Sequence, residues 1–128
     1  MTRDTFLETV KERAYFDDKD AAKKATQATL EVLGKRLFGG EASDLAAQLP
    51  DGIKDYLIPA EATTSFGPEE FVSMVADREE VDKGTARLHA TAVLSVLSEA
   101  VSGGEMKDVQ SQLPDDYKSL FQNPAPSE

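Results

Sequence analysis

The stretch GGEASDLAAQLPD, residues 39–51, returns later in the chain as GGEMKDVQSQLPD, residues 103–115. The identical positions share one offset of 64 residues, and they comprise a Gly-Gly-Glu turn, an aspartate (Asp44 and Asp108) and a Gln-Leu-Pro-Asp corner. Below, two residues at this offset are called counterparts. A repeat at one fixed spacing is the signature of a structural unit used twice. The sequence therefore predicts a tandem duplication.

Each copy has the apolar spacing of amphipathic helices, at i, i+3, i+4 and i+7. Helices are expected over about 4–15, 19–37 and 41–48, over 68–79, 83–101 and 105–112, and as a short fourth helix after each of Pro50 and Pro114. The two long helices are apolar around most of their circumference, which is typical of a helix in the middle of a bundle. We therefore predict an all-α fold, in which a tandem duplicated four-helix unit packs into one helical bundle with pseudo-two-fold symmetry.

Polar and glycine residues mark the expected helix ends. Asp17 or Asp18, and Asp82, stand where the long helices need an N-cap. Gly39 and Gly103 are expected to end the long helices in the left-handed conformation, which glycine adopts without steric cost. The resulting division is a first helical unit at 1–58, a linker at 59–67, a second helical unit at 68–121 and a disordered, proline-rich tail at 122–128.

The composition narrows the classes of partner. The 128 residues carry a net charge of −10, whereas duplex nucleic acids and anionic membranes bind basic surfaces, so neither is expected as a partner. No apolar run is long enough to span a membrane, and the N-terminus has no apolar segment of a signal peptide. Cysteine is absent, which removes disulfides and thiolate chemistry. A cytoplasmic location is the expectation.

Few residues of the sequence are candidates for catalysis or metal binding. His89 is the single histidine, and its counterpart is Ala25, so we interpret it as a polar helix residue and not as a catalytic one. Acidic residues stand mostly at expected helix starts, where capping and the helix dipole explain them; Glu41 and Glu105 are interpreted in this way. We expect no enzyme activity, no cofactor and no metal site.

The candidate interaction surface consists of the glutamines at matching places before the two prolines and of aromatic residues in the short fourth helices: Gln48, Tyr56, Gln112, Tyr117 and Phe121. Tyrosine beside an aliphatic residue is common at interfaces. The leading interpretation is a non-enzymatic interaction or accessory module that binds a protein partner or a second copy of itself. For the glutamines themselves, the favoured interpretation is structural, in which they hydrogen-bond the backbone that the prolines leave unpaired, and the docking surface is the alternative.

Two other functions stay open. One is a ligand- or metal-dependent activity in a site between the two units, with His89 and nearby acids. The other is an acidic charge mimic that binds a basic protein, which predicts affinity that falls steeply with salt.

A family resemblance covers nearly the whole chain. The segments that carry it are Gly40-Glu41-Ala42 with Gln48-Leu49-Pro50, their second-copy equivalents Gly104-Glu105 and Gln112-Leu113-Pro114, and the apolar positions of 71–75, 90–97 and 117–121. Together they resemble a bacterial and archaeal family known as domain of unknown function 2267. The resemblance implies an all-helical, internally duplicated domain, and it supplies no catalytic residues and no substrate.

Overall fold

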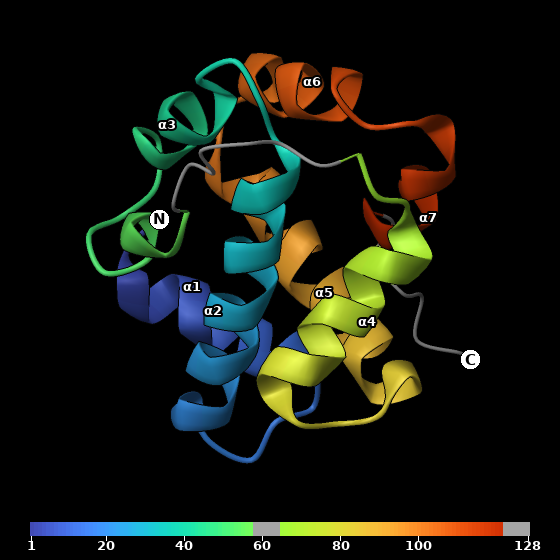
Figure 1. Cartoon of the computed structure of the whole chain (residues 1–128). Helices are drawn as coiled ribbons and strands as arrows, with labels where there is room; N and C mark the ends of the chain where they lie inside the picture. Colours follow the sequence, from blue (N-terminus) through green and yellow to red (C-terminus); the bar gives the residue numbers. More distant parts are fainter. Residues whose placement is uncertain (58–64, 122–128) are drawn as a thin grey trace.

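The computed structural model describes residues 1–57 and 65–121, and these form an all-helical molecule without strands (Figure 1). The elements are α1 (Arg3–Arg13), α2 (Lys19–Arg36), α3 (Glu41–Ala46), the 3-10 turn η1 (Lys54–Tyr56), α4 (Pro68–Glu79), α5 (Lys83–Ala100), α6 (Gly103–Ser111), the 3-10 turn η2 (Asp115–Tyr117) and α7 (Lys118–Phe121). The all-α prediction is confirmed. Residues 59–64 of the expected linker and the expected tail at 122–128 lie outside the described residues.

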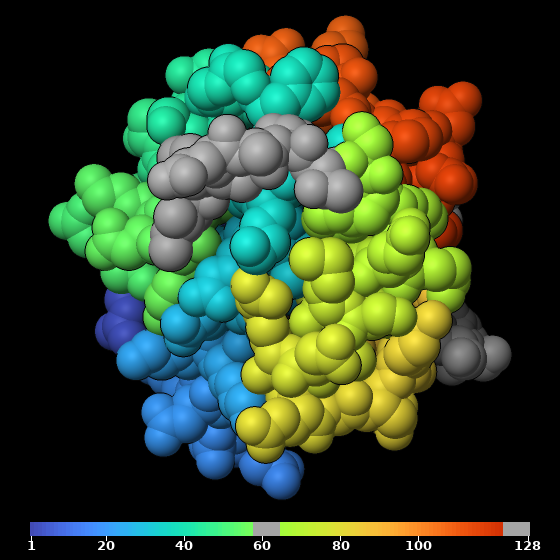
Figure 2. Space-filling view, in the orientation of Figure 1, coloured from blue at the N-terminus to red at the C-terminus, as the bar shows by residue number. Residues whose placement is uncertain are grey.

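The two long helices form the centre of the fold. Each has 18 residues and begins at an aspartate N-cap, where Asp18 accepts the N–H of Ala21 at 2.9 Å and Asp82 accepts that of Thr85 at 2.8 Å. Helix α2 packs on α1, α4 and α5, and α5 also packs on α1, α4 and α7. The seam between α2 and α4 is visible on the surface (Figure 2), whereas α3 and α6 lie side by side across one end (Figure 1).

One hydrophobic core serves both halves of the chain, here residues 1–57 and 65–121. Phe6 and Leu30 from the first half and Phe71 and Leu94 from the second are buried in the same cluster. Burial of apolar surface is the main favourable term in folding. Neither half therefore covers its own apolar residues alone.

The glycine turns of the two halves differ. Gly39 and Gly40 both have left-handed backbones, with φ of 65° and 83°. The prediction that Gly39 and Gly103 end the long helices is wrong, because α2 and α5 end at the extended C-caps Leu37 and Val101, and Gly103 opens α6. Ser102 precedes it and caps α6, since its hydroxyl accepts a backbone N–H from the first turn of the helix at 3.1 Å. The counterpart of Ser102 is Phe38, whose side chain has no acceptor with which to cap a helix.

The expected fourth helix also differs between the halves. After Pro50 the chain forms only the short turn η1, whereas after Pro114 η2 continues into α7. Gly52 has a left-handed φ of 88°, which interrupts a right-handed helix at its start. Its counterpart is Asp116, which lies within η2.

Candidate functional site

The two corner glutamines bind across the molecule. Gln48 Oε1 accepts the N–H of Ser102 at 2.8 Å. Gln112 Oε1 accepts the N–H of Phe38 at 3.0 Å, and its Nε2 donates to the Phe38 carbonyl at 3.0 Å. Because Phe38 and Ser102 are counterparts, each glutamine holds the backbone just beyond the long helix of the opposite half. These hydrogen bonds therefore join the two halves of the chain, and not, as expected, the backbone beside the prolines.

These crossed hydrogen bonds flank the contact between α3 and α6, where acidic side chains of both halves meet. One carboxylate oxygen from each of Glu41, Glu105 and Asp108 lies within 4.8 Å of the others. We call these three residues the carboxylate site. Glu41 is buried, with 7 % of its surface exposed, Glu105 is half-buried and Asp108 is exposed. Glu41 and Glu105 are counterparts, so the same acid comes from both halves.

The electrostatics of this site are unfavourable for two charged glutamates. The Oε2 atoms of Glu41 and Glu105 are buried without a hydrogen-bond partner in the described part of the chain. Burial raises the pKa of Glu41 from 4.5 to about 7, and the hydrogen bond to the Glu105 carboxyl and the charges of Glu105, Asp108 and Asp44 add to this effect. The geometry can thus hold a proton between carboxyls, or a cation among them.

His89 lies apart from the carboxylate site. It is buried on α5, and its Nδ1 is 2.7 Å from Glu79 Oε1 at the end of α4. The Phe16 ring packs on it, with 4.4 Å between ring centroids. The acid that the structure brings to His89 is therefore Glu79, whose Oε2 is buried without a hydrogen-bond partner among the described residues.

Tyr117, expected on the interaction surface, is in the core. Its hydroxyl donates to the Phe66 carbonyl at 2.5 Å, and Arg36 Nε donates to the same oxygen at 2.8 Å. The Arg36 guanidinium also lies 5.5 Å from the centre of the Tyr117 ring. Burial raises the pKa of the Tyr117 phenol, which keeps the hydroxyl protonated as a donor. Phe66 belongs to the described end of the expected linker, and these contacts fix it to the core.

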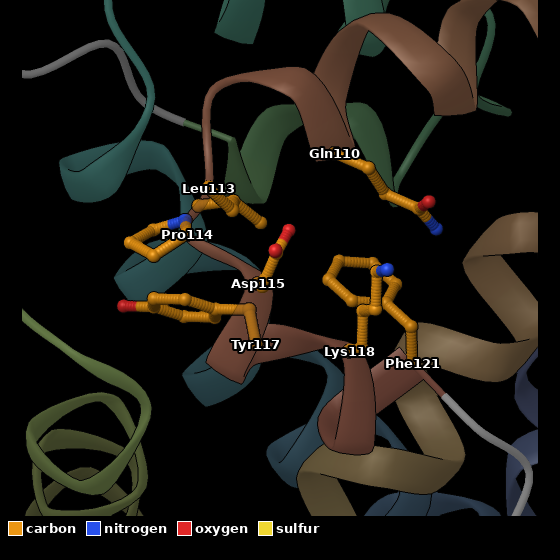
Figure 3. Close-up of a pocket in the computed structure, with 7 residues that line it drawn as sticks. All are labelled: Gln110, Leu113, Pro114, Asp115, Tyr117, Lys118 and Phe121. Atoms are coloured by element: carbon orange, nitrogen blue, oxygen red, sulfur yellow. The ribbon is translucent and has the colours of Figure 1, made fainter.

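A small pocket of about 40 Å³ opens beside Tyr117 (Figure 3). Its lining residues are Gln110, Leu113, Pro114, Asp115, Tyr117, Lys118 and Phe121. Leu113 and Pro114 lie on one side of it and Lys118 and Phe121 on the other (Figure 3). Of the predicted surface, Tyr117 and the half-buried Phe121 line this pocket, whereas Gln48 and the half-buried Tyr56 are not among its lining residues.

Comparison with protein families now places the chain. The model of a family described as "Uncharacterized conserved protein (DUF2267)" matches residues 3–120, nearly the whole sequence. The chain belongs to this family. The resemblance seen in the sequence is confirmed, and a search of curated proteins gives no match.

In this DUF2267 protein, sequence reasoning missed the meeting of Glu41 and Glu105. The signal was present, since the same acid follows Gly-Gly in both copies, but the helix dipole gave each glutamate a sufficient local explanation. Within the residues that the structure describes, no helix has both the length and the apolar character needed for a transmembrane span.

Proposed function

We propose that this DUF2267 protein is a tandem duplication of one helical unit and acts as a non-enzymatic module that binds another protein. The order of elements supports the duplication, because a helix of 11 or 12 residues, a helix of 18 residues, a short helix and a 3-10 turn follow each other in both halves. The crossed glutamine contacts support it further, since each joins counterpart positions. A pseudo-two-fold axis would pass between α3 and α6.

Phe38 is the residue that carries the binding proposal. Its side chain is 51 % exposed, although its backbone is held firmly. Gln112 binds both its N–H and its carbonyl at 3.0 Å, and the carbonyl also accepts the N–H of Glu41 at 3.2 Å. An aromatic side chain on a fixed backbone loses little entropy on binding, which is typical of interface anchors.

The small pocket beside Tyr117 begins one residue after the glutamine that holds Phe38. Gln112, which holds Phe38, is followed directly by Leu113 and Pro114, and these line the pocket together with Phe121. A volume of about 40 Å³ is far below the hundreds of Å³ that small-molecule sites usually offer, but it suits one short aliphatic side chain of a protein partner. We call Phe38, Leu113, Pro114 and Phe121 the apolar anchor surface.

The partner is expected to be a different protein. Two copies of a chain with a net charge of −10 repel each other, so self-association is disfavoured at low salt. The same charge favours a partner with basic residues around its apolar contact, whose affinity falls with rising salt. Light scattering should accordingly give the mass of a monomer, 13.9 kDa.

The proposal is tested by capturing partners from an extract of the source cells with immobilised protein and identifying them by mass spectrometry. The double variant Phe38→Ser/Phe121→Ser should lose the proteins that the wild type retains. Tyr15→Asn is the matched control, because Tyr15 is an aromatic residue, 73 % exposed, outside this surface, and asparagine tolerates its left-handed φ of 60°. Equal retention by all three proteins would refute the role of the apolar anchor surface.

A further inference from the structure

The carboxylate site combines acids that lie far apart in the sequence. Glu41 comes from the start of α3, and Glu105 and Asp108 come from α6, and three of their oxygens lie within 4.8 Å of one another. Like charges at such separations repel, and the repulsion grows where water is excluded. Such an arrangement is stabilised by a proton or by a cation, either of which neutralises part of the charge.

The protein itself supplies no such cation in the part that the structure describes. None of the three acids is in an ion pair with a lysine, arginine or histidine there. Glu41 is only 7 % exposed, and its Oε2 is buried beside the other two acids without a hydrogen-bond partner; the same holds for Glu105 Oε2. Buried polar atoms normally have partners, so these two Oε2 atoms are available to a ligand.

We propose that Glu41, Glu105 and Asp108 bind a hard divalent cation of the Mg²⁺, Mn²⁺ or Ca²⁺ class, with one carboxylate oxygen each and water in the other positions. The donor set is entirely oxygen, which suits these cations, whereas zinc and copper sites usually contain histidine or cysteine. Asp44, the counterpart of Asp108, lies on the same short helix as Glu41 and adds negative charge nearby.

The bound cation joins the two halves. Because Glu41 belongs to the first half and the other two ligands belong to the second, the cation holds α3 against α6 and strengthens the contact that the glutamines make on either side. A ligand that binds only the folded protein raises its stability by mass action. This inference is independent of the proposed partner surface.

The test is calorimetric titration with MnCl₂ and, separately, CaCl₂, together with melting temperatures with and without 1 mM of each salt. All proteins are first treated with EDTA and measured at pH 7.5. We expect saturable binding at one equivalent, with a Kd on the order of 10⁻⁴ M for at least one cation, and a higher melting temperature. Glu105→Gln and Glu41→Gln should weaken this binding about tenfold or more, because each removes a charged ligand.

Asp77→Asn is the matched control, because it removes one exposed acid from the last turn of α4. This end of α4 points away from the end of the molecule that α3 and α6 cover (Figure 1). The Asp77→Asn variant should bind the cation as the wild type does. If a glutamine variant does not fold, Asp108→Asn changes an exposed ligand and gives the same comparison. The proposal is overturned if the wild type shows no saturable binding of either cation, or if the ligand variants bind as tightly as Asp77→Asn.

Discussion

At the scale of single residues, Glu41 gives the folded protein a pH dependence near neutrality. Its pKa is about 7 in the folded protein against 4.5 for an ordinary glutamate, so the folded state keeps a proton that the unfolded chain releases between these values. The stability that the protonated form provides is complete below pH 4.5 and is lost as the pH rises through 7.

We therefore expect Glu41→Gln, which imitates the protonated acid, to match the wild type near pH 5 and to be more stable at pH 8. Urea unfolding in EDTA buffer, at several pH values, gives both free energies. The comparison cancels the titrating groups that do not interact with Glu41, which the two proteins share. A stability difference that stays constant from pH 5 to pH 8 would contradict the pKa assigned to Glu41.

Two single residues also show which contacts could not be predicted from the sequence. A tyrosine near the C-terminus is compatible with a docking surface, and only the fold brings Phe66 and Arg36 to Tyr117 and buries it. Likewise, Gln112 could be matched to the proline that follows two residues later, but not to Phe38, 74 residues away. Side-chain partners of this kind depend on tertiary structure, which local spacing does not contain.

At the scale of elements, the helix bounds were largely predictable. The range 68–79 agrees with α4, and each long helix ends one residue earlier than expected. Bounds of this kind can be predicted because residues such as Asp82 and Pro68 favour a helix start through local backbone chemistry. Two errors in the predicted elements fall at positions where the two counterpart residues differ. Ser102 in place of Phe38 changes how α6 begins, and Gly52 in place of Asp116 shortens the fourth helix.

The crossed glutamine contacts make an element-scale prediction. Gln48→Ala should speed amide hydrogen exchange at Ser102, and Gln112→Ala should speed it at Phe38, because each variant frees the amide that its glutamine binds. Each lost hydrogen bond should cost about 1 kcal/mol, and Gln112→Ala should cost more, since it removes two. Amide hydrogen exchange at Ser102 and Phe38, measured by NMR in the two variants, tests this prediction. Faster exchange only next to the mutated corner would contradict the crossed arrangement.

At the scale of the whole molecule, the shared core predicts one cooperative unfolding transition. Helix α1 packs on α5 and α2 packs on α4 and α5, so unfolding either half exposes apolar surface of the other. NMR signals from α1 and from α6 should disappear at the same urea concentration as the helical circular dichroism signal. Two separate midpoints would mean that the halves are independent domains.

The cation site is tested most directly by amide NMR spectra recorded during addition of substoichiometric Mn²⁺, a paramagnetic ion that broadens nearby signals. If the acids of the two halves form one cation site, signals of α3 and α6, such as those of Ala42 and Met106, should disappear first, while those around Asp77 persist. Uniform broadening over the acidic surface, or broadening that begins around Asp77, would contradict a site between α3 and α6.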